Sequence, residues 1–392
     1  MRIAVIMPRG ATMCRRTVNS METVAHTLRR HSRQVNAVRM FCDVGAVEPL
    51  EADLVTVPAG LTKGGRVAAV ARRLAAYDPD YIEHHQQLES SAALARRFPD
   101  KVHVLYRHTR IKRPRDPIGR IRYEARLKAF DHVIFVSEAA VAEFLEDYPA
   151  FEGRVSAICN PIDTTPWRAD PDAREKLILF SGRATEEKGL EPFCAALGKV
   201  LDGWPDWRAV LLLGDWDKHK AWADPVVRKL DRFADRVEIQ KSASLVEVMA
   251  ATRRAAIAVT PSLVAEALGL TALEAHAAGA ALISSGRGGL REASGPHAVY
   301  VDPPEVDGLA LALSDLMSDP ARRAGLGRAG QVWVAKVHSP LARAAQLDDL
   351  RDLLLAAPKP LRRRRGWAAD WLGVLAGRSS PKNEGVMPYI AG

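Results

Sequence analysis

Short apolar runs alternate with helical stretches in both halves of this chain of 392 residues. A strand buried on both faces of a parallel sheet shows as a continuous apolar run, and a helix usually connects it to the next strand. The alternation therefore predicts an α/β fold with parallel sheets, whose ligands gather at the carboxyl ends of the strands. In the first half, the expected strands are 2–7, 35–40, 53–57, 81–83, 102–106, 132–136 and 155–158, and the expected helices are 18–31, 65–77, 88–98 and 138–148.

A proline-containing segment without apolar periodicity divides the chain. It reads NPIDTTPW over 160–167, a composition typical of a linker. After it the alternation starts again, which predicts a second α/β domain. Its expected strands lie near 177–181, 208–213, 236–240, 256–259, 281–284 and 298–301. The expected divisions of the whole chain are a first domain over 1–163, a second over 164–336, a helix over 337–357 and a tail over 358–392.

The stretch from Thr260 to Gly279, TPSLVAEALGLTALEAHAAG, follows the apolar run 255–259. We expect a strand, then a polar loop, then a helix. Gly269 would let the backbone approach a ligand closely. A helix that begins near Leu270 would point the unpaired N–H groups of Leu270 and Thr271 outward. Because such a helix start attracts phosphate, this segment predicts an anion site.

Two carboxylates belong to the same stretch. Glu266 lies in the loop before the helix, and Glu274 lies about one turn inside it. Ionised carboxylates only accept hydrogen bonds, which suits sugar hydroxyls. A sugar linked to a diphosphate is therefore the ligand class that fits. The alternative is a solvated helix start.

A second candidate anion-binding turn precedes the stretch 260–279. It lies in the sequence KLILFSGRATEEKG over 176–189. An apolar strand leads to a turn at Gly182, and the cations Arg183 and Lys188 follow. A strand, a glycine turn and two cations are suited to binding an anion. The patterns GxxxxGK[ST] and GxGxxG are both missing, so neither segment is a P-loop or a dinucleotide fingerprint.

The GRxxxxKG turn is followed by two glutamates with seven residues between them, the second inside a Leu-Glu-Ala helix start. This combination resembles family four of the retaining, nucleotide-sugar-dependent glycosyltransferases, which have the GT-B fold. The Gly-Asp turn at 214–215 and GRGGLRE over 286–292 resemble further turns of that family. The resemblance covers about residues 1–357, most strongly 176–303. It implies two Rossmann-like domains facing a cleft, with the helix over 337–357 crossing back to the first domain.

The resemblance also implies roles for these residues. Arg183 and Lys188 would offset the charge that develops on the leaving diphosphate, assisted by the helix start. Glu274 would hold the ribose hydroxyls, and Glu266 the hydroxyls of the transferred sugar. No Asp-x-Asp element lies near these motifs, so we expect turnover without a metal or another cofactor. The donor-binding residues implied are Gly182, Gly269, Leu270, Thr271 and Glu274.

The first domain offers fewer matches. His108 follows the expected strand 102–106 at the family position where a histidine approaches the donor sugar, and a structural histidine is the alternative. Of its neighbours, we expect His85 to line the cleft and His84 to play no part. The loop 8–19 departs from the family, which usually carries a Gly-Gly pair there. Gly10 is the only glycine in that region. We expect it to contact the nucleotide-sugar donor.

The segment 101–128 carries ten basic residues and two acidic ones. A solvated face, an anionic acceptor and an anionic membrane surface each fit such a run. Few aromatic residues are interleaved for base stacking, so nucleic acid is not the expected partner. The resemblance places the acceptor side in this domain and favours a lipid-linked acceptor. The tail adds LRRRRGWAADWLGVLAG over 361–377, which reads as a basic amphipathic membrane anchor, with packing on the body or disorder as alternatives.

The expected function is thus transfer of a sugar from a UDP- or GDP-sugar to a hydroxyl of a lipopolysaccharide, exopolysaccharide or glycolipid. The four cysteines lack metal-ligand or disulfide spacing, and no run reaches eighteen apolar residues. We expect a cytoplasmic protein of envelope biosynthesis that attaches peripherally to the inner face of the cytoplasmic membrane. A nucleotide-sugar 2-epimerase is one alternative. A non-catalytic scaffold that binds membrane or nucleic acid is the other, supported only by the net charge of +9.

Overall fold

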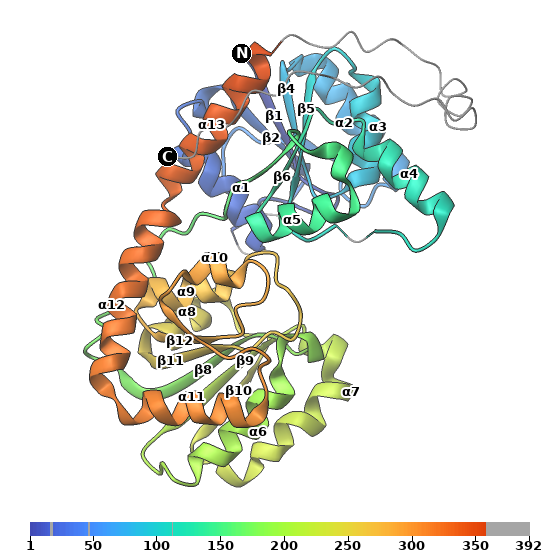
Figure 1. Cartoon of the computed structure of the whole chain (residues 1–392). Helices are drawn as coiled ribbons and strands as arrows, with labels where there is room; N and C mark the ends of the chain where they lie inside the picture. Colours follow the sequence, from blue (N-terminus) through green and yellow to red (C-terminus); the bar gives the residue numbers. More distant parts are fainter. Residues whose placement is uncertain (16–18, 46–47, 112, 358–392) are drawn as a thin grey trace. The chain divides into compact units, whose positions relative to one another are not determined.

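The computed structural model describes residues 1–15, 19–45, 48–111 and 113–357. Residues 1–356 form one compact unit. This unit contains two parallel sheets with helices packed on their faces (Figure 1). The predicted α/β class with two parallel sheets is confirmed. The predicted tail over 358–392 lies outside the described residues, and the four divisions of the chain stay predictions.

The first sheet has the order β3-β2-β1-β4-β5-β6-β7 with parallel neighbours. It and its helices are called the first lobe. Ile3 and Val5 pack in the apolar cluster that contains α1, whereas Ala4 and Ile6 pack in the cluster that contains α2. The strands are β1 (Ile3–Ile6), β2 (Val38–Asp43), β3 (Val55–Val57), β4 (Tyr81–His85), β5 (Val102–Arg107), β6 (His132–Phe135) and β7 (Val155–Ala157). The helices are α1 (Ser20–His31), η1 (Val35–Ala37), α2 (Lys63–Tyr77), α3 (Leu88–Arg97), α4 (Pro117–Leu127), α5 (Glu138–Asp147) and η2 (Pro149–Phe151).

The second sheet has the order β10-β9-β8-β11-β12-β13, again parallel, and forms the second lobe with its helices. The strand order reverses beside β8, the kind of place where open α/β sheets bind ligands. The strands are β8 (Glu175–Arg183), β9 (Arg208–Gly214), β10 (Val237–Lys241), β11 (Ala255–Thr260), β12 (Ala281–Ser284) and β13 (Ala298–Tyr300). The helices are η3 (Glu186–Lys188), α6 (Leu190–Leu201), α7 (Trp216–Val227), η4 (Arg228–Phe233), α8 (Leu245–Arg254), α9 (Leu270–Ala278), α10 (Leu290–Ser294) and α11 (Val306–Ser318).

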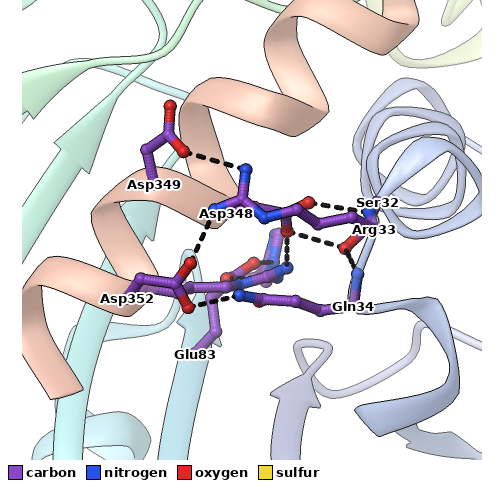
Figure 2. A network of polar contacts seen from close by, with 9 residues as sticks. Ser32, Arg33, Gln34, Glu83, Asp348, Asp349 and Asp352 are labelled. Carbon is purple, nitrogen blue, oxygen red and sulfur yellow. Dashed lines mark hydrogen bonds and ion pairs between the residues drawn. The ribbon is translucent and has the colours of Figure 1, made fainter.

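Two final helices return the chain to the first lobe. Helix α12 (Pro320–Val337) packs on α9, and α13 (Pro340–Ala356) packs on α1. The predicted crossing helix is therefore confirmed. The buried carboxylate of Asp348 on α13 accepts hydrogen bonds from the Ser32 hydroxyl (2.6 Å) and the Arg33 backbone N–H (2.8 Å), just beyond the end of α1 (Figure 2). Leu347 joins an apolar cluster that contains residues of both lobes.

Two elements differ from the sequence prediction. The strand expected over 35–40 begins only at Val38, because η1 occupies the preceding three residues. The basic segment 101–128, for which no helix was predicted, contains α4. The Asp116 side chain caps α4 by accepting from the Gly119 N–H (2.6 Å), and Pro117 stands at its first position. Both features favour a helix start.

Candidate active site

One cavity gathers most of the predicted site. It has a volume of about 420 Å³, lies at the carboxyl ends of β8 and β11, and is also lined by residues of the first lobe. Nine of the ten predicted residues line it, and Gly10 does not. Those nine are His108, Gly182, Arg183, Lys188, Glu266, Gly269, Leu270, Thr271 and Glu274. The sequence did not single out further lining residues, including Ser20, Met21, Val136, Asn160 and Ser262.

The start of α9 faces this cavity. Gly269 has a φ of +106°, and a Cβ atom there would lie 2.4 Å from the Leu290 side chain. The position therefore requires glycine. No side chain caps the helix, and the N–H groups of Leu270 and Thr271 have no hydrogen-bond partner within the described residues. They can therefore receive an anion, as the sequence predicted.

Lys188 and Glu266 form an ion pair in the cavity wall, with 2.6 Å between Nζ and Oε1. The Ser262 hydroxyl also donates to Glu266. Their two loops meet at Gly189, where a Cβ atom would lie 2.0 Å from the Pro261 carbonyl oxygen. The sequence predicted that Lys188 contacts the diphosphate and that Glu266 contacts the transferred sugar. It did not predict that the two groups form an ion pair with each other.

The backbone of Glu266 is held from the other side as well. Its N–H donates to the Arg287 carbonyl (3.2 Å), and its own carbonyl accepts from the Gly289 N–H (2.9 Å). A Cβ atom at Gly288 would lie 2.5 Å from that carbonyl oxygen. The glycines of GRGGLRE therefore let this turn run close beside the glutamate and fix its position.

Arg183 is half exposed and pairs with Glu187 four positions later. Both predicted cations thus already have carboxylate partners. A diphosphate that bound at the end of β8 would have to compete with Glu187 for Arg183 and with Glu266 for Lys188.

Glu274 has no hydrogen bond or ion pair within the described residues. Its removal from water raises the pKa of this carboxyl to about 8, because the charged form is poorly solvated there. The group therefore holds a proton at neutral pH. It can then donate one hydrogen bond as well as accept others.

His108 follows β5 and lines the cavity as predicted. Its ring stacks on Tyr106 and His85, and its Nε2 lies 2.8 Å from Nδ1 of His85. Burial, His85 and Arg107 together lower the pKa of His108 well below its usual value, so the ring is neutral.

One expectation for the first lobe needs correction. His85 does not line the cavity, because it is buried beneath His108. Gly10 does not line the cavity, and its contact with the donor stays a prediction. Its N–H donates to the Asp43 carboxylate (2.9 Å), and its φ is +91°.

Two polar contacts join the lobes next to the cavity. The Glu292 carboxylate accepts hydrogen bonds from the N–H groups of Glu138 and Ala139 at the start of α5, each at 2.7 Å. The Arg110 guanidinium donates to the carbonyl of Ala265, the residue before Glu266 (3.1 Å). In the sequence, Glu292 stands out only as part of the GRGGLRE turn, and its partners are too distant along the chain for spacing to reveal them.

Among the described residues, no group of three or more His, Cys, Asp or Glu side chains is arranged to hold a metal ion. Among the same residues, none of the helices has the length and apolar character needed to cross a membrane.

Two protein families match the chain. The family described as glycosyl transferases group 1 matches residues 162–333, which include α9 and both anion-binding turns. The family described as glycosyltransferase family 4 matches residues 21–166. The two matches overlap at residues 162–166 and together run from α1 into α12.

Individual proteins are similar over between half and nine tenths of the chain. A glycogen synthase of Mycobacterium tuberculosis is 31% identical over 206 residues, 51% of this chain and 49% of that protein. A GDP-mannose-dependent alpha-(1-6)-phosphatidylinositol monomannoside mannosyltransferase of Mycolicibacterium smegmatis is 26% identical over 245 residues, 56% and 62% of the two chains. The match spans only about half to three fifths of these relatives. The crystal structure of Anabaena HepE with UDP shares the fold, with a TM-score of 0.72, 16% identity and coverage of 90% and 100%.

Proposed function

The chain belongs to the group 1 glycosyltransferases, and on that premise we propose that it transfers a sugar from a UDP- or GDP-sugar to a hydroxyl of an envelope glycan or glycolipid. One observation carries the proposal. Lys188, the uncapped start of α9 and the two carboxyl groups Glu266 and Glu274 line a single cavity. This set matches the parts of a nucleotide-diphosphate sugar, which has an anionic centre with hydroxyl-bearing rings on both sides.

When the donor binds, its diphosphate would replace Glu266 as the partner of Lys188. The diphosphate lies at the N–H groups of Leu270 and Thr271 and takes Lys188 from Glu266, so that the Glu266 carboxylate becomes available to the hydroxyls of the transferred sugar. Glu274 contacts the ribose hydroxyls. Arg183 and Lys188 stabilise the negative charge that develops on the leaving diphosphate. Since these cations carry that task, turnover needs no divalent metal.

The chemistry proposed is retaining transfer. The acceptor oxygen attacks the anomeric carbon from the side of the leaving group. Its bond to that carbon forms as the bond between the carbon and the diphosphate oxygen breaks, and the hydroxyl proton passes to a phosphate oxygen. The protein positions both substrates and stabilises the departing charge.

For the acceptor, we propose a glycan or lipid of the envelope, such as a lipopolysaccharide or exopolysaccharide precursor, reached from the cytoplasmic face of the membrane. The Mycolicibacterium relative is named for a phosphatidylinositol-linked acceptor. Helix α4 adds a surface suited to anionic lipid. Ile118 and Ile121 are 57% and 46% exposed on it, and the exposed Arg115 and Arg122 have no ion-pair partner in the described residues. Exposed apolar side chains beside unpaired cations are typical of interfacial helices.

Ligand-induced thermal stabilisation tests the donor assignment. The panel holds UDP, GDP, ADP and their common sugar conjugates, each in EDTA. A ligand that binds only the native state at about 100 times its Kd stabilises it by about 2.7 kcal/mol. We expect one nucleotide series to raise Tm. The shift should be lost in Lys188→Ala and kept in Lys199→Ala, which removes an exposed lysine paired with Asp307.

Product analysis with the selected donor then tests the reaction. Transfer should persist in EDTA and retain the anomeric configuration by NMR. If no nucleotide shifts Tm with or without added Mg²⁺ or Mn²⁺, the transferase proposal is wrong. If a shift appears only with metal, the metal-independent mechanism is wrong.

A further inference from the structure

A buried polar chain connects the crossing helix to the cavity. Arg351 on α13 donates to Oε2 of Glu83 on β4 (2.9 Å). The other carboxylate oxygen, Oε1, lies 2.9 Å from Nε2 of His85, and Nδ1 of His85 lies 2.8 Å from Nε2 of His108. Arg351, Glu83 and His85 are each at most 2% exposed. Figure 2 shows Glu83 in one network of polar contacts with the α13 residues Asp348 and Asp352.

The protons along this chain follow from what each group can donate. Arg351 is always protonated, and an ionised Glu83 can only accept. Nε2 of His85 must therefore carry the proton that bonds to Glu83. Above the usual histidine pKa an imidazole has a single N–H group, so in that pH range Nδ1 of His85 accepts and Nε2 of His108 donates to it. The His108 ring then has its one N–H group at Nε2, and its Nδ1 keeps a lone pair.

That lone pair has no partner within the described residues, and His108 lines the cavity. We propose that Glu83 and Arg351 are positioning residues that hold Nδ1 of His108 unprotonated, so that it accepts a hydrogen bond from a hydroxyl of the transferred sugar. The identity of the hydroxyl rests on the proposed function. The tautomer of His108 does not rest on it, because hydrogen bonds within the protein set that tautomer.

Arg351 sets the direction of hydrogen-bond donation from His108 through His85 to Glu83, because it keeps Glu83 charged. Burial alone would raise the pKa of Glu83, but the Arg351 charge and the hydrogen bonds from His85 and Arg351 outweigh it and lower that pKa to about 2. Arg351 also donates to Asp348 (3.2 Å) and lies over the Tyr81 ring. A protonated or amide group at position 83 could donate toward His85 and reverse every hydrogen bond as far as the cavity.

The Glu83→Gln variant should produce that reversal with little change of shape. Arg351 still needs an acceptor, so the single oxygen of the new amide faces Arg351 and its NH₂ group faces His85. Nε2 of His85 must then accept, its Nδ1 donates to His108, and Nδ1 of His108 becomes the protonated nitrogen. Arg351→Lys keeps a cation beside Glu83 and should preserve the original direction of hydrogen-bond donation, from His108 to His85 and from His85 to Glu83.

Nitrogen-15 NMR of the full chain with labelled histidine distinguishes the two tautomers directly. The chain has eleven histidines, so loss of one pair of signals in His108→Gln assigns His108. At about pH 8, above the usual histidine pKa, we expect a bare Nδ1 in the wild type and in Arg351→Lys, and a protonated Nδ1 in Glu83→Gln. Arg33→Ala, which removes the ion pairs of Arg33 with Asp349 and Asp352 of α13 but leaves Glu83 untouched, should match the wild type.

A protonated Nδ1 in the wild type would overturn the proposal, as would an unchanged tautomer in a folded Glu83→Gln. If Glu83→Gln does not fold, the wild type and Arg351→Lys still decide, because a protonated Nδ1 in either refutes it. With the donor selected by the thermal panel, Glu83→Gln should lower kcat roughly three- to tenfold, the worth of one neutral hydrogen bond. If His108 has a bare Nδ1 but no nucleotide sugar binds, the proposed function is refuted. The role of Glu83 and Arg351 in setting the His108 tautomer is then unaffected.

Discussion

At the scale of single residues, Glu274 in the cavity makes the free energy of unfolding depend on pH. Its pKa rises from the usual 4.5 to about 8 in the folded chain. Between these values the folded state holds a proton that the unfolded state has lost. The stability that this proton contributes is complete below about pH 4.5 and is lost as the pH rises through about 8. Within that window the group lowers the free energy of unfolding by up to about 1.4 kcal/mol per pH unit.

Urea titrations at several pH values across that window measure the slope. Glu274→Gln should flatten it and raise stability near the upper end, whereas Glu152→Gln, at an exposed position in the first lobe, should leave it unchanged. Equal slopes in the wild type and Glu274→Gln would show that the carboxyl is ionised and solvated in the folded protein.

Residue types and spacing predicted which side chains line the cavity, but not how those side chains pair. Glu266, Glu274 and the glycine before α9 belong to one short stretch, so their proximity follows from local structure. Lys188 and Glu266 are 78 positions apart, and only the packing of two loops through Gly189 brings them together. His85 was misplaced for a related reason. The alternation of a strand indicates which face a residue occupies, not which ring stacks above it.

At the scale of secondary-structure elements, α4 yields a prediction about membranes. Replacing Ile118 and Ile121 together by serine removes apolar area that we expect to enter an anionic bilayer. Burying one such side chain contributes roughly 1.5–3 kcal/mol. The double variant should therefore float with phosphatidylglycerol vesicles at least tenfold less strongly than the wild type.

Val332→Ser is the matched control, because Val332 is 69% exposed on α12 and should leave flotation unchanged. Repeating the comparison in a chain that ends at Ala357 separates the α4 surface from the basic tail. Undiminished flotation of the double isoleucine variant in that shorter chain would exclude α4 as the contact.

Most strands could be predicted because they are buried on both faces, and continuous apolar runs are their signature. β11 and β12 are fully buried and lie within a residue of their predicted bounds. Helix α4 was missed for the opposite reason. Its residues are exposed or half-buried apart from the buried Leu127, so apolar periodicity is weak. Its capping signal, Asp116 followed by Pro117, was present in the sequence and is the one that would have found it.

At the scale of the whole molecule, Glu292 joins the lobes by capping α5. Glu292→Ala removes both acceptors of the Glu138 and Ala139 N–H groups. Hydrogen bonds to a charged group contribute about 1.5–3 kcal/mol. Amide exchange at these two positions should therefore accelerate at least tenfold, while the interior of α5 keeps its protection.

Hydrogen exchange followed by NMR or mass spectrometry measures this effect. Glu146→Ala, an exposed change on α5 itself, should leave exchange at both positions unaltered. Unchanged exchange in Glu292→Ala would mean that the inter-lobe contact is not maintained in solution.

The return of α13 to α1 has a consequence for how the protein is made. Ser32 and Asp348 are 316 positions apart and bond in the buried interior. During translation, the first lobe leaves the ribosome long before the helix that covers it. Until α13 emerges, part of the apolar surface of α1 stays uncovered and Glu83 lacks its cation. The lobe synthesised first is thus the last to be completed, so a chaperone would have most to protect on the nascent chain there.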